Sequence, residues 1–264
     1  MCELFAMSTR LPSTITLSLE EFSRHGGHTG PHKDGWGIAW YEQGDVHLLK
    51  EATSASNSRT MQFIKDNPFQ SALVLCHIRK ATQGDVASRN CQPVLRELGG
   101  VWHSFAHNGH LKGLQDDPRF KTGSYQSVGE TDSEYAFCAL LERMQTLWHA
   151  GQPPTYAARL AVVQTFAAEL RNLGPANFLY SDGDVLFVHA HQRHQSDGTI
   201  RAPGLWRLAR HCAEGGVFDG TGVHVAARGA EQDVVLIASV PLSQENWQPL
   251  EEGAVIGIRL GRAL

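Results

Sequence analysis

The chain has 264 residues, of which 42% are hydrophobic and 19% are charged, the composition of an ordinary soluble globular protein. It carries 23 basic and 27 acidic residues, for a formal net charge of −4, and no stripe or tail of lysines and arginines that would indicate nucleic-acid binding. No apolar run approaches the roughly 18 residues that suggest a membrane span, and the start lacks the pattern of a secretory signal, so we expect a cytoplasmic protein.

The N-terminal part of the chain is predicted to contain five strands and two short helices. The strand-like stretches are apolar and are bounded by turn residues: Cys2–Ser8, Gly35–Tyr41, Val46–Lys50, Ala72–Arg79 and Trp102–His107. Short helices fit Ser18–Arg24, which begins with a capping-box pattern, and Ser58–Lys65.

Two longer helices are predicted in the middle of the chain, after a loop over residues 113–129. The spacing of Thr131 and Glu134 is that of a capping box, with Glu134 as the cap partner. Apolar residues then recur with a helical period: Phe137, Leu140, Leu141, Met144 and Trp148. A second helix ends at Gly174-Pro175 and has one apolar face: Tyr156, Leu160, Val163, Phe166 and Leu170.

The C-terminal part is predicted to return to strands: Ala176–Ser181, Val185–Ala190, Leu205–Arg210, Val223–Ala227, Val234–Ser239 and Ala254–Arg259. The Asp182-Gly183 pair marks a hairpin turn, and residues 192–203 are predicted to form a loop. Strands, a helical pair and more strands favour an α+β or layered α/β fold. Since no linker divides the chain, we expect a single domain over residues 1–264.

Cys2 follows the initiator methionine directly. If Met1 is removed, Cys2 carries both a thiol and a free α-amine, whose reference pKa of about 7.7–8.0 suits proton transfer near neutral pH. Activation of a nucleophile by a nearby N-terminal amine is an established arrangement. The alternative is that Cys2 is a small apolar residue at a strand end.

Four further segments hold polar groups at strand ends or turns: His32–Ala39, His77–Thr82, His107–Gly109 and Thr131–Glu134. With Cys2, their order and residue types resemble the class II glutamine amidotransferases, the cysteine branch of the N-terminal-nucleophile (Ntn) hydrolases. The pattern His-x-Asp-Gly-Trp-Gly, without an attached synthase domain, is similar to the stand-alone YafJ-type members.

The resemblance implies a four-layer αββα sandwich, with two mainly antiparallel sheets between helical layers. It also implies that Cys2 is the nucleophile and that its free amine is the general base. The side-chain amide of Asn108 and the backbone N–H of Gly109 would stabilise the oxyanion. From the residues alone, Asn108 and Gly109 fit an Asn-Gly turn equally well.

The resemblance also implies a site for an amino-acid head group. Arg79 would bind the α-carboxylate of glutamine as a bidentate fork, and Asp132 would accept hydrogen bonds from the α-ammonium. Thr82 corresponds to a position whose backbone borders the substrate, and Gly35 and Trp36 to a close approach of the backbone to the ligand. From the residues alone, each has another explanation. Arg79 could be a solvated arginine at a strand end, Asp132 an acidic residue favoured at a helix N-terminus, and Gly35 a glycine required by packing.

Fourteen histidines invite a metal hypothesis, with three candidate sets: His25, His28 and His32; His103, His107 and His110; and His189, His191 and His194. Glycines and a proline interrupt the first set, the second straddles a strand end, and no His-Glu-x-x-His pattern occurs. We therefore expect no metal and no cofactor. The five cysteines form no CxxC pair, which argues against a disulfide framework, and Cys76 and Cys138 are expected to be packing residues.

The sequence thus predicts hydrolysis of the side-chain amide of glutamine, or of a γ-glutamyl amide, through a Cys2 thioester. Two alternatives stay open. The chain is a glutaminase subunit that delivers ammonia to a separate synthase, or it is a non-catalytic amino-acid-binding module. The expected partners are a glutamine-like small molecule and, in the first alternative, a synthase, with neither nucleic acid nor membrane. Homo-oligomerisation is left open.

Overall fold

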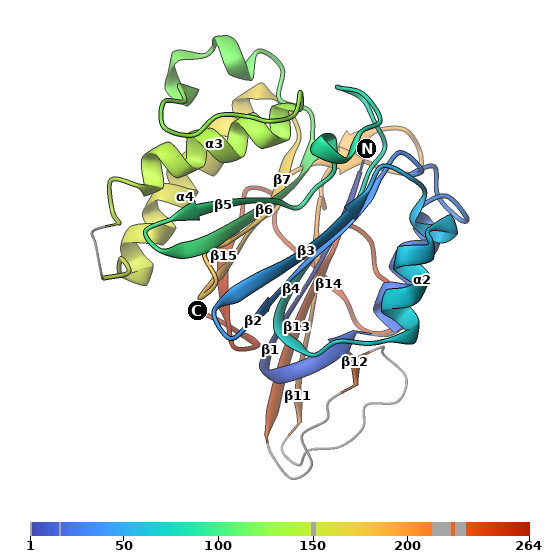
Figure 1. Cartoon of the computed structure of the whole chain (residues 1–264). Coiled ribbons are helices and arrows are strands. Elements are labelled where there is room, and N and C mark those ends of the chain that lie inside the picture. Colours follow the sequence, from blue (N-terminus) through green and yellow to red (C-terminus); the bar gives the residue numbers. More distant parts are fainter. Residues whose placement is uncertain (1, 16, 149–151, 213–222, 225–230) are drawn as a thin grey trace.

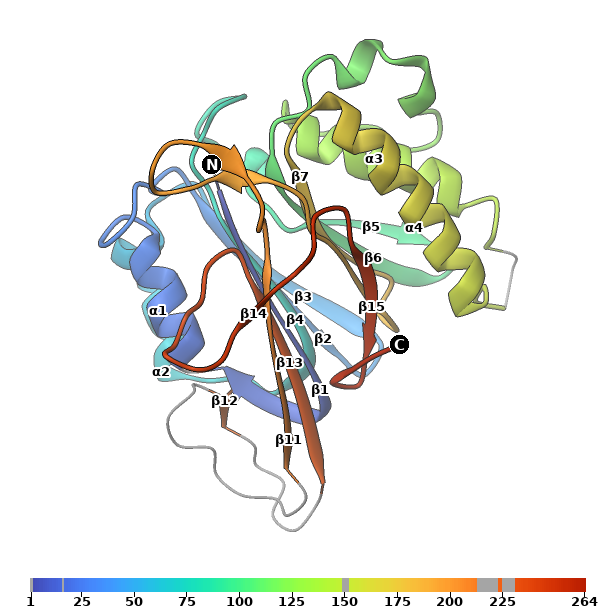
Figure 2. The same ribbon diagram turned by 180° about the vertical axis from the view of Figure 1, so that it is seen from behind.

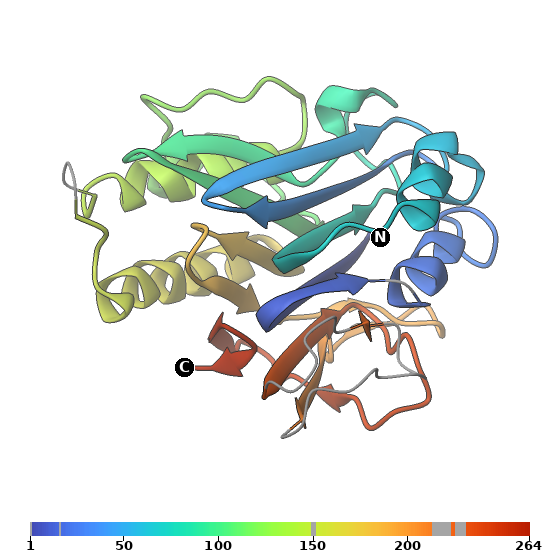
Figure 3. The same ribbon diagram turned by 60° about the horizontal axis from the view of Figure 1, so that its bottom comes forward.

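The computed structural model describes residues 2–15, 17–148, 152–212, 223–224 and 231–264. Two β-sheets lie face to face, and a pair of helices covers the outer face of each (Figures 1 and 3). The layers therefore follow the order αββα, and the four-layer α+β sandwich predicted from the sequence is confirmed.

The first sheet contains the strand that begins beside Cys2. Its strands are antiparallel neighbours in the order β14 (Gln248–Pro249), β11 (Trp206–Cys212), β13 (Gln232–Ala238), β1 (Glu3–Ile15), β4 (Ser71–Ile78), β2 (Trp36–Glu42) and β3 (Asp45–Glu51), and β12 (Val223–His224) pairs with the far end of β1. Because β1 lies between β13 and β4, the N-terminal segment is held on both sides.

The second sheet is also antiparallel. Its order is β16 (Arg262–Ala263), β15 (Val255–Arg259), β8 (Leu186–His189), β7 (Ala176–Ser181), β6 (Val101–Gly109) and β5 (Val94–Leu98). A separate hairpin of β9 (Arg193–His194) and β10 (Ile200–Arg201), drawn in orange, lies beside the N-terminal end of β1 (Figure 2). The β9–β10 hairpin therefore covers the end of the sandwich at which Cys2 lies.

Three apolar clusters hold the four layers together. Helices α1 (Leu17–His25) and α2 (Arg59–Asp66) pack on the first sheet around Phe5 and Trp36. Helices α3 (Asp132–Met144) and α4 (Tyr156–Leu170) pack on the second sheet around Phe105, Phe178 and Phe187. Between the sheets lie mostly aliphatic side chains: Leu4, Ala6, Leu75, Ala106, Leu179 and Val188. Burial of apolar surface at about 25 cal/mol per Å² makes these contacts the main stabilising term.

The helix predictions are largely confirmed. Thr131 Oγ1 accepts a hydrogen bond from Glu134 N, as the capping box requires. Helix α4 begins at Tyr156 but ends at Leu170, with a 3₁₀ turn before the predicted stop at Gly174, and α3 ends at Met144, short of Trp148. The prediction that Glu134 completes the box is wrong, because its buried carboxylate instead accepts hydrogen bonds from Val128 N and Gly129 N and pairs with Arg96. The predicted loop over residues 113–129 contains two short 3₁₀ turns, η3 (Leu114–Asp116) and η4 (Pro118–Phe120).

The main strands lie where they were predicted, but β1 continues to Ile15, well past the predicted end at Ser8. Strand β5 was missed, and residues 192–203 form the β9–β10 hairpin instead of a plain loop. Of the predicted strand Val223–Ala227, only β12 is described, and residues 225–227 lie outside the described part. Three more short 3₁₀ turns connect elements: η1 (Ala55–Asn57), η2 (Ser88–Asn90) and η5 (Arg171–Leu173).

Among the helices of the described part, none is long and apolar enough to cross a lipid bilayer. The longest, α4, has 15 residues, whereas a spanning helix needs about 20.

Candidate active site

Cys2 stands just before β1, at the end of the sandwich covered by the β9–β10 hairpin (Figure 2). Its Sγ lies 3.6 Å from the carbonyl oxygen of Lys80, the second residue after β4. The residue is half-buried, and burial raises the pKa of the Cys2 thiol above its usual value. The sulfur is therefore held as a thiol at neutral pH, and it needs a proton acceptor before it can attack.

Asn108 and Gly109 close β6 in the opposite sheet. Asn108 is completely buried, and its Nδ2 lies 3.4 Å from the hydroxyl of Ser239, which also accepts a 2.9 Å hydrogen bond from Leu4 N. A Cβ added to Gly109 would lie 1.8 Å from the carbonyl oxygen of Pro175. The glycine is thus required by the neighbouring strand, and its backbone N–H remains the predicted oxyanion donor.

Arg79 is 3% exposed, and its guanidinium donates to backbone carbonyls of a single loop. Nη1 donates to Asp85 O at 2.9 Å, and Nη2 donates to Gln83 O at 2.8 Å and Gly84 O at 3.1 Å. The guanidinium of Arg79 therefore holds the backbone of residues 83–85 in place. Binding of a substrate carboxylate by the same group stays a prediction, and it requires these donors to be shared or exchanged.

Asp132 is the first residue of α3, and its carboxylate accepts two backbone hydrogen bonds. Its Oδ1 accepts from Ser133 N at 2.8 Å, and its Oδ2 accepts from Leu111 N at 2.7 Å. A cavity of about 200 Å³ opens beside Asp132 and Gln83. The charges of Arg79 and Asp132 both act on the Cys2 thiol, with opposite effects on its pKa. Gln83, whose carbonyl accepts from Arg79, lines this cavity together with Asp132, so Asp132 lies beside the loop that Arg79 holds.

The remaining predicted contacts lie at the edge of this neighbourhood. Thr82 is exposed, at the start of the loop that Arg79 holds. The side chain of Trp36 is fully buried in the outer core of the first sheet. Gly35 has a φ of +150°, and a Cβ there would lie 2.4 Å from Cys91 Sγ. Packing against Cys91 explains Gly35, and any substrate contact at residues 35–36 would come from their backbone.

Sequence reasoning missed a buried ionic cluster beside the nucleophile. Glu3 is 6% exposed and accepts a 2.8 Å hydrogen bond from His25 Nδ1, while His32 and Arg193 each lie 3.9 Å from its other oxygen. Burial raises the pKa of Glu3, but these three partners more than offset it, so the pKa lies below its usual value. The hydrogen bond that His25 donates to the Glu3 carboxylate raises the pKa of His25.

Replacing His25 by Ala should lower the free energy of unfolding by about 1 kcal/mol, mainly between pH 4.5 and 6.5. Glu3 contributes stability above its unfolded pKa of 4.5, and that contribution is lost as pH falls through its lower folded value. His25 contributes below its unfolded pKa of 6.5, and that contribution is lost as pH rises through its higher folded value. Urea titrations at pH 5.5 and 9 measure the difference.

His47 is the matched control, since it pairs with Glu42 at 3.3 Å but both side chains are about half exposed, at 50% and 51%. Solvent screening leaves such a pair little energy, so we expect no comparable pH-dependent loss in His47→Ala. An equal loss for His25→Ala at both pH values would contradict the assignment.

Sequence reasoning also missed the tether of the Arg79 loop. The carboxylate of Glu130 accepts hydrogen bonds from Asp85 N at 3.0 Å, Asn90 Nδ2 at 2.9 Å and Arg89 Nη2 at 2.8 Å. Because Glu130 also precedes Thr131 and Asp132 in the chain, it connects the Arg79 loop to the start of α3. The three donors are spread over Asp85–Asn90, and nothing in their sequence spacing identifies Glu130 as their common acceptor.

Replacing Glu130 by Ala should raise KM for an amino-acid substrate about tenfold and leave kcat unchanged, because it loosens the head-group side without touching the sulfur. Steady-state kinetics at varied substrate concentration separates the two constants. Glu97→Ala is the control: its carboxylate braces a different turn by accepting from Gly100 N at 2.7 Å. A fall in kcat at unchanged KM would show that the tether acts on the chemistry instead.

Most histidines of the three candidate sets, for which no metal was expected, have partners within the protein. His103 Nδ1 lies 2.7 Å from Tyr180 Oη, His107 Nδ1 lies 2.9 Å from Ser133 Oγ, and His189 Nδ1 lies 3.0 Å from Ala254 O. These rings connect strands and helices of the core. Each ring thus has at least one buried hydrogen bond, while His107 Nε2 and His189 Nε2 are buried without a partner among the described residues.

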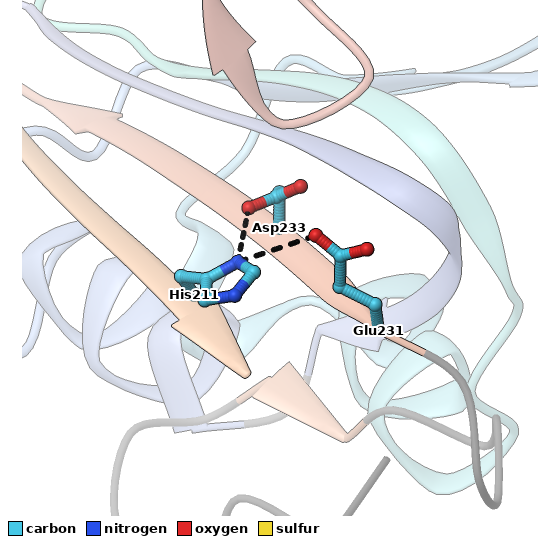
Figure 4. Close-up of side chains that lie close together, drawn as sticks. All are labelled: His211, Glu231 and Asp233. Carbon is cyan, nitrogen blue, oxygen red and sulfur yellow. Dashed lines mark hydrogen bonds and ion pairs between the residues drawn. The ribbon is translucent and has the colours of Figure 1, made fainter. Parts of the chain in front are cut away.

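A different group, His211, Glu231 and Asp233, offers three metal-ligating atoms within 4.8 Å of one another (Figure 4). Its carboxylates are already paired with arginines: Arg262 lies 2.6 Å from Asp233 and 2.8 Å from Glu231, and Arg10 lies 3.0 Å from Glu231. All four carboxylate oxygens of Glu231 and Asp233 therefore pair with an arginine or with His211. The resulting salt-bridge cluster connects β16 to β13 and β11.

Comparison with known proteins decides the family. The sequence pattern of the class II glutamine amidotransferases matches residues 1–264. The chain belongs to this family. It is 37% identical over 256 residues to Escherichia coli YafJ, named as a candidate glutamine amidotransferase, and the match covers 96% of this chain and 95% of YafJ. A candidate glutamine amidotransferase of Haemophilus influenzae is 32% identical over 265 residues, covering 100% of this chain and 86% of that protein.

Solved structures agree with this assignment. A crystal structure of a candidate glutamine amidotransferase from Pseudomonas aeruginosa matches with a TM-score of 0.70 and 30% identity, covering 100% of this chain and 99% of that one. The glutamine phosphoribosylpyrophosphate amidotransferase of Bacillus subtilis matches with a TM-score of 0.59 at 17% identity, over 98% of this chain and 47% of that one. At that identity the second match supports the fold alone.

Proposed function

We propose that this family member hydrolyses the side-chain amide of glutamine, or of a related γ-glutamyl amide, through a thioester on Cys2. Glutamine as the substrate follows from the family, and the nucleophile follows from the position of Cys2. The observation that carries the proposal is the meeting of the two sheets at one end of the sandwich. There Cys2 Sγ lies 3.6 Å from Lys80 O, beside Arg79, and a single hydroxyl connects Leu4 N with Asn108 Nδ2.

In the first half-reaction the Cys2 thiol gives its proton to its own α-amine as the sulfur bonds to the amide carbon. The carbonyl oxygen takes up the negative charge, and Asn108 Nδ2 and Gly109 N–H would stabilise it. The C–N bond then breaks, and the departing nitrogen takes the proton from the α-ammonium. Ammonia, or an amine, leaves and a thioester remains.

In the second half-reaction a water molecule attacks the thioester while the α-amine accepts a proton from it. The C–S bond breaks, the thiolate recovers that proton, and a γ-carboxylate is released. Arg79 and Asp132 would hold the zwitterionic head group through both steps, since one cation and one anion complement it. No oxidant, reductant or second substrate besides water is needed.

The test combines turnover with covalent labelling. Protein whose intact mass shows removal of Met1 is incubated with a panel of glutamine and γ-glutamyl amides, and released glutamate is measured. In parallel, a diazoketone analogue of glutamine should add once per chain, at Cys2 in peptide maps. Labelling of Cys91 or Cys138 alone, or turnover that continues with Cys2 fully labelled, would sink the mechanism.

A further inference from the structure

Ser239 occupies a position where the two halves of the proposed catalytic apparatus meet. It follows β13 directly and lies opposite Leu4 in the ladder, where Ser239 N donates to Leu4 O at 3.0 Å. Its hydroxyl accepts from Leu4 N at 2.9 Å and from Asn108 Nδ2 at 3.4 Å. The side chain is 1% exposed, so water does not compete for these bonds.

The two bonds join elements of different sheets. Leu4 belongs to β1, two residues after the nucleophile, while Asn108 belongs to β6 on the other side of the sandwich. The side chains that pack between the sheets around Leu4 and Ala106 are mostly aliphatic, and such packing carries no directional preference. The hydroxyl of Ser239 therefore supplies a directional link between the strand that carries the sulfur and the amide that would face the oxyanion.

The chemistry of the carboxamide makes this link consequential. Nδ2 carries two N–H bonds, and one is directed to Ser239. Among the described residues Asn108 Nδ2 has no other acceptor, and Asn108 Oδ1 is buried without a partner. Rotation of the carboxamide about its last bond would exchange the nitrogen for an oxygen, which repels an oxyanion. The contact with Ser239 holds the carboxamide in place, because the hydroxyl lies within hydrogen-bond distance of its nitrogen.

Ser239 is itself fixed from the other side. Arg193, in the β9–β10 hairpin, donates from Nη1 to Ser239 O at 2.7 Å. Its Nη2 lies 3.9 Å from Glu3 Oε1, next to Cys2 in the chain. The backbone of Ser239 is thus held by β1 on one side and by the hairpin on the other, so its hydroxyl has a defined place.

We infer that Ser239 is a positioning residue that fixes the carboxamide of Asn108 toward the oxyanion and sets its distance from Cys2. This inference rests on the proposed amide hydrolysis. At 3.4 Å the contact between Asn108 Nδ2 and Ser239 Oγ is at the long end of hydrogen-bond distances. The expected role is in the chemical step, because the hydrogen bonds of Ser239 go to Leu4, Asn108 and Arg193 and, among the described residues, to neither Arg79 nor Asp132.

Replacing Ser239 by Ala should lower kcat by about 10- to 100-fold and leave KM unchanged. The upper figure is the usual cost of misplacing a reacting group by about 1 Å. Activity is normalised to the fraction of chains that the diazoketone labels at Cys2, so loss of folded protein does not enter. Ser8→Ala is the control: Ser8 is also a buried serine of this sheet, and its hydroxyl accepts from Gly261 N at 3.1 Å. That variant should lose stability but keep kcat.

The decisive measurement is a double-mutant cycle with Asn108→Ala. If Ser239 acts through Asn108, adding Ser239→Ala to that variant should cost no further activity. An additive loss would overturn the inference, since the effect would then run through Leu4, and so would a Ser239→Ala enzyme with wild-type kcat. Wild-type protein that neither turns over nor labels at Cys2 would refute the proposed function instead, which keeps the two failures distinct.

Discussion

Placing one alanine between Met1 and Cys2 should lower turnover by about 10²–10⁴-fold, although the thiol is retained. Removal of Met1 then leaves Ala as the N-terminus, and the nitrogen of Cys2 is tied into a peptide bond. Burial raises the pKa of the Cys2 thiol, so little thiolate exists at neutral pH to compensate for the lost base. Replacing Cys2 by Ala should cost more, about 10⁴-fold or above, because the covalent path is gone.

The pH profile distinguishes loss of the base from misfolding. In the wild type, the acidic limb of kcat/KM should follow the α-amine, with a reference pKa of about 7.7–8.0. In the extended variant, the residual rate should keep rising at higher pH as the thiol itself ionises. Cys138→Ala is the control, since Cys138 is fully buried in α3 and should not alter the profile. An extended variant with wild-type turnover would contradict the role of the amine.

The helices and the long strands could be predicted because local physics determines them. The hydroxyl of Thr131 caps α3, and the apolar period of α4 fits its burial on the second sheet. Two missed hairpins carried a usable signal: β5 and β6 are joined through Gly99-Gly100, and β9 and β10 are joined across a turn that contains Asp197-Gly198. Glycines with positive φ mark such turns, but charged residues such as Arg96, Glu97 and Arg201 interrupt the apolar pattern of the flanking strands.

The order of the predicted site motifs could be found from the sequence, but the hydrogen-bond partners of each side chain could not. Gly35 and Gly109 fit a ligand as well as a neighbouring strand until Cys91 and Pro175 are placed against them. From the sequence, the guanidinium of Arg79 is predicted to bind a carboxylate. In the folded chain it donates hydrogen bonds to backbone carbonyls.

Contacts across large sequence separations are the part that local pattern cannot reach. Ser239 meets Leu4 across 235 residues and Asn108 across 131. Glu3 meets Arg193 only because the β9–β10 hairpin covers the end of β1. Serine, glutamate and arginine occur throughout the chain, so their type alone carries no information. Only the packing of the two sheets places Ser239, Glu3 and Arg193 near Cys2.

Replacing Asn108 by Ala should lower kcat by roughly 100–1000-fold with KM little changed, the usual cost of losing one oxyanion donor. Replacement by Asp should cost more, because it removes the donor and places an acidic group where negative charge develops. Head-group contacts are unaffected in both variants, so the loss belongs to the chemical step. Single-turnover kinetics with a chromogenic γ-glutamyl anilide reports acylation directly.

The control for Asn108→Ala is Gln232→Ala. Gln232 is also a buried carboxamide of the core, with Nε2 donating to Leu11 O and Ser13 Oγ at 2.9 Å each. It lies at the far end of β13, and Leu11 is about 30 Å along β1 from Cys2 at the usual strand rise. Its loss should destabilise the sheet and leave kcat per labelled chain intact. If the two variants lose kcat equally, Asn108 serves the fold, and the oxyanion must be stabilised by backbone N–H groups alone.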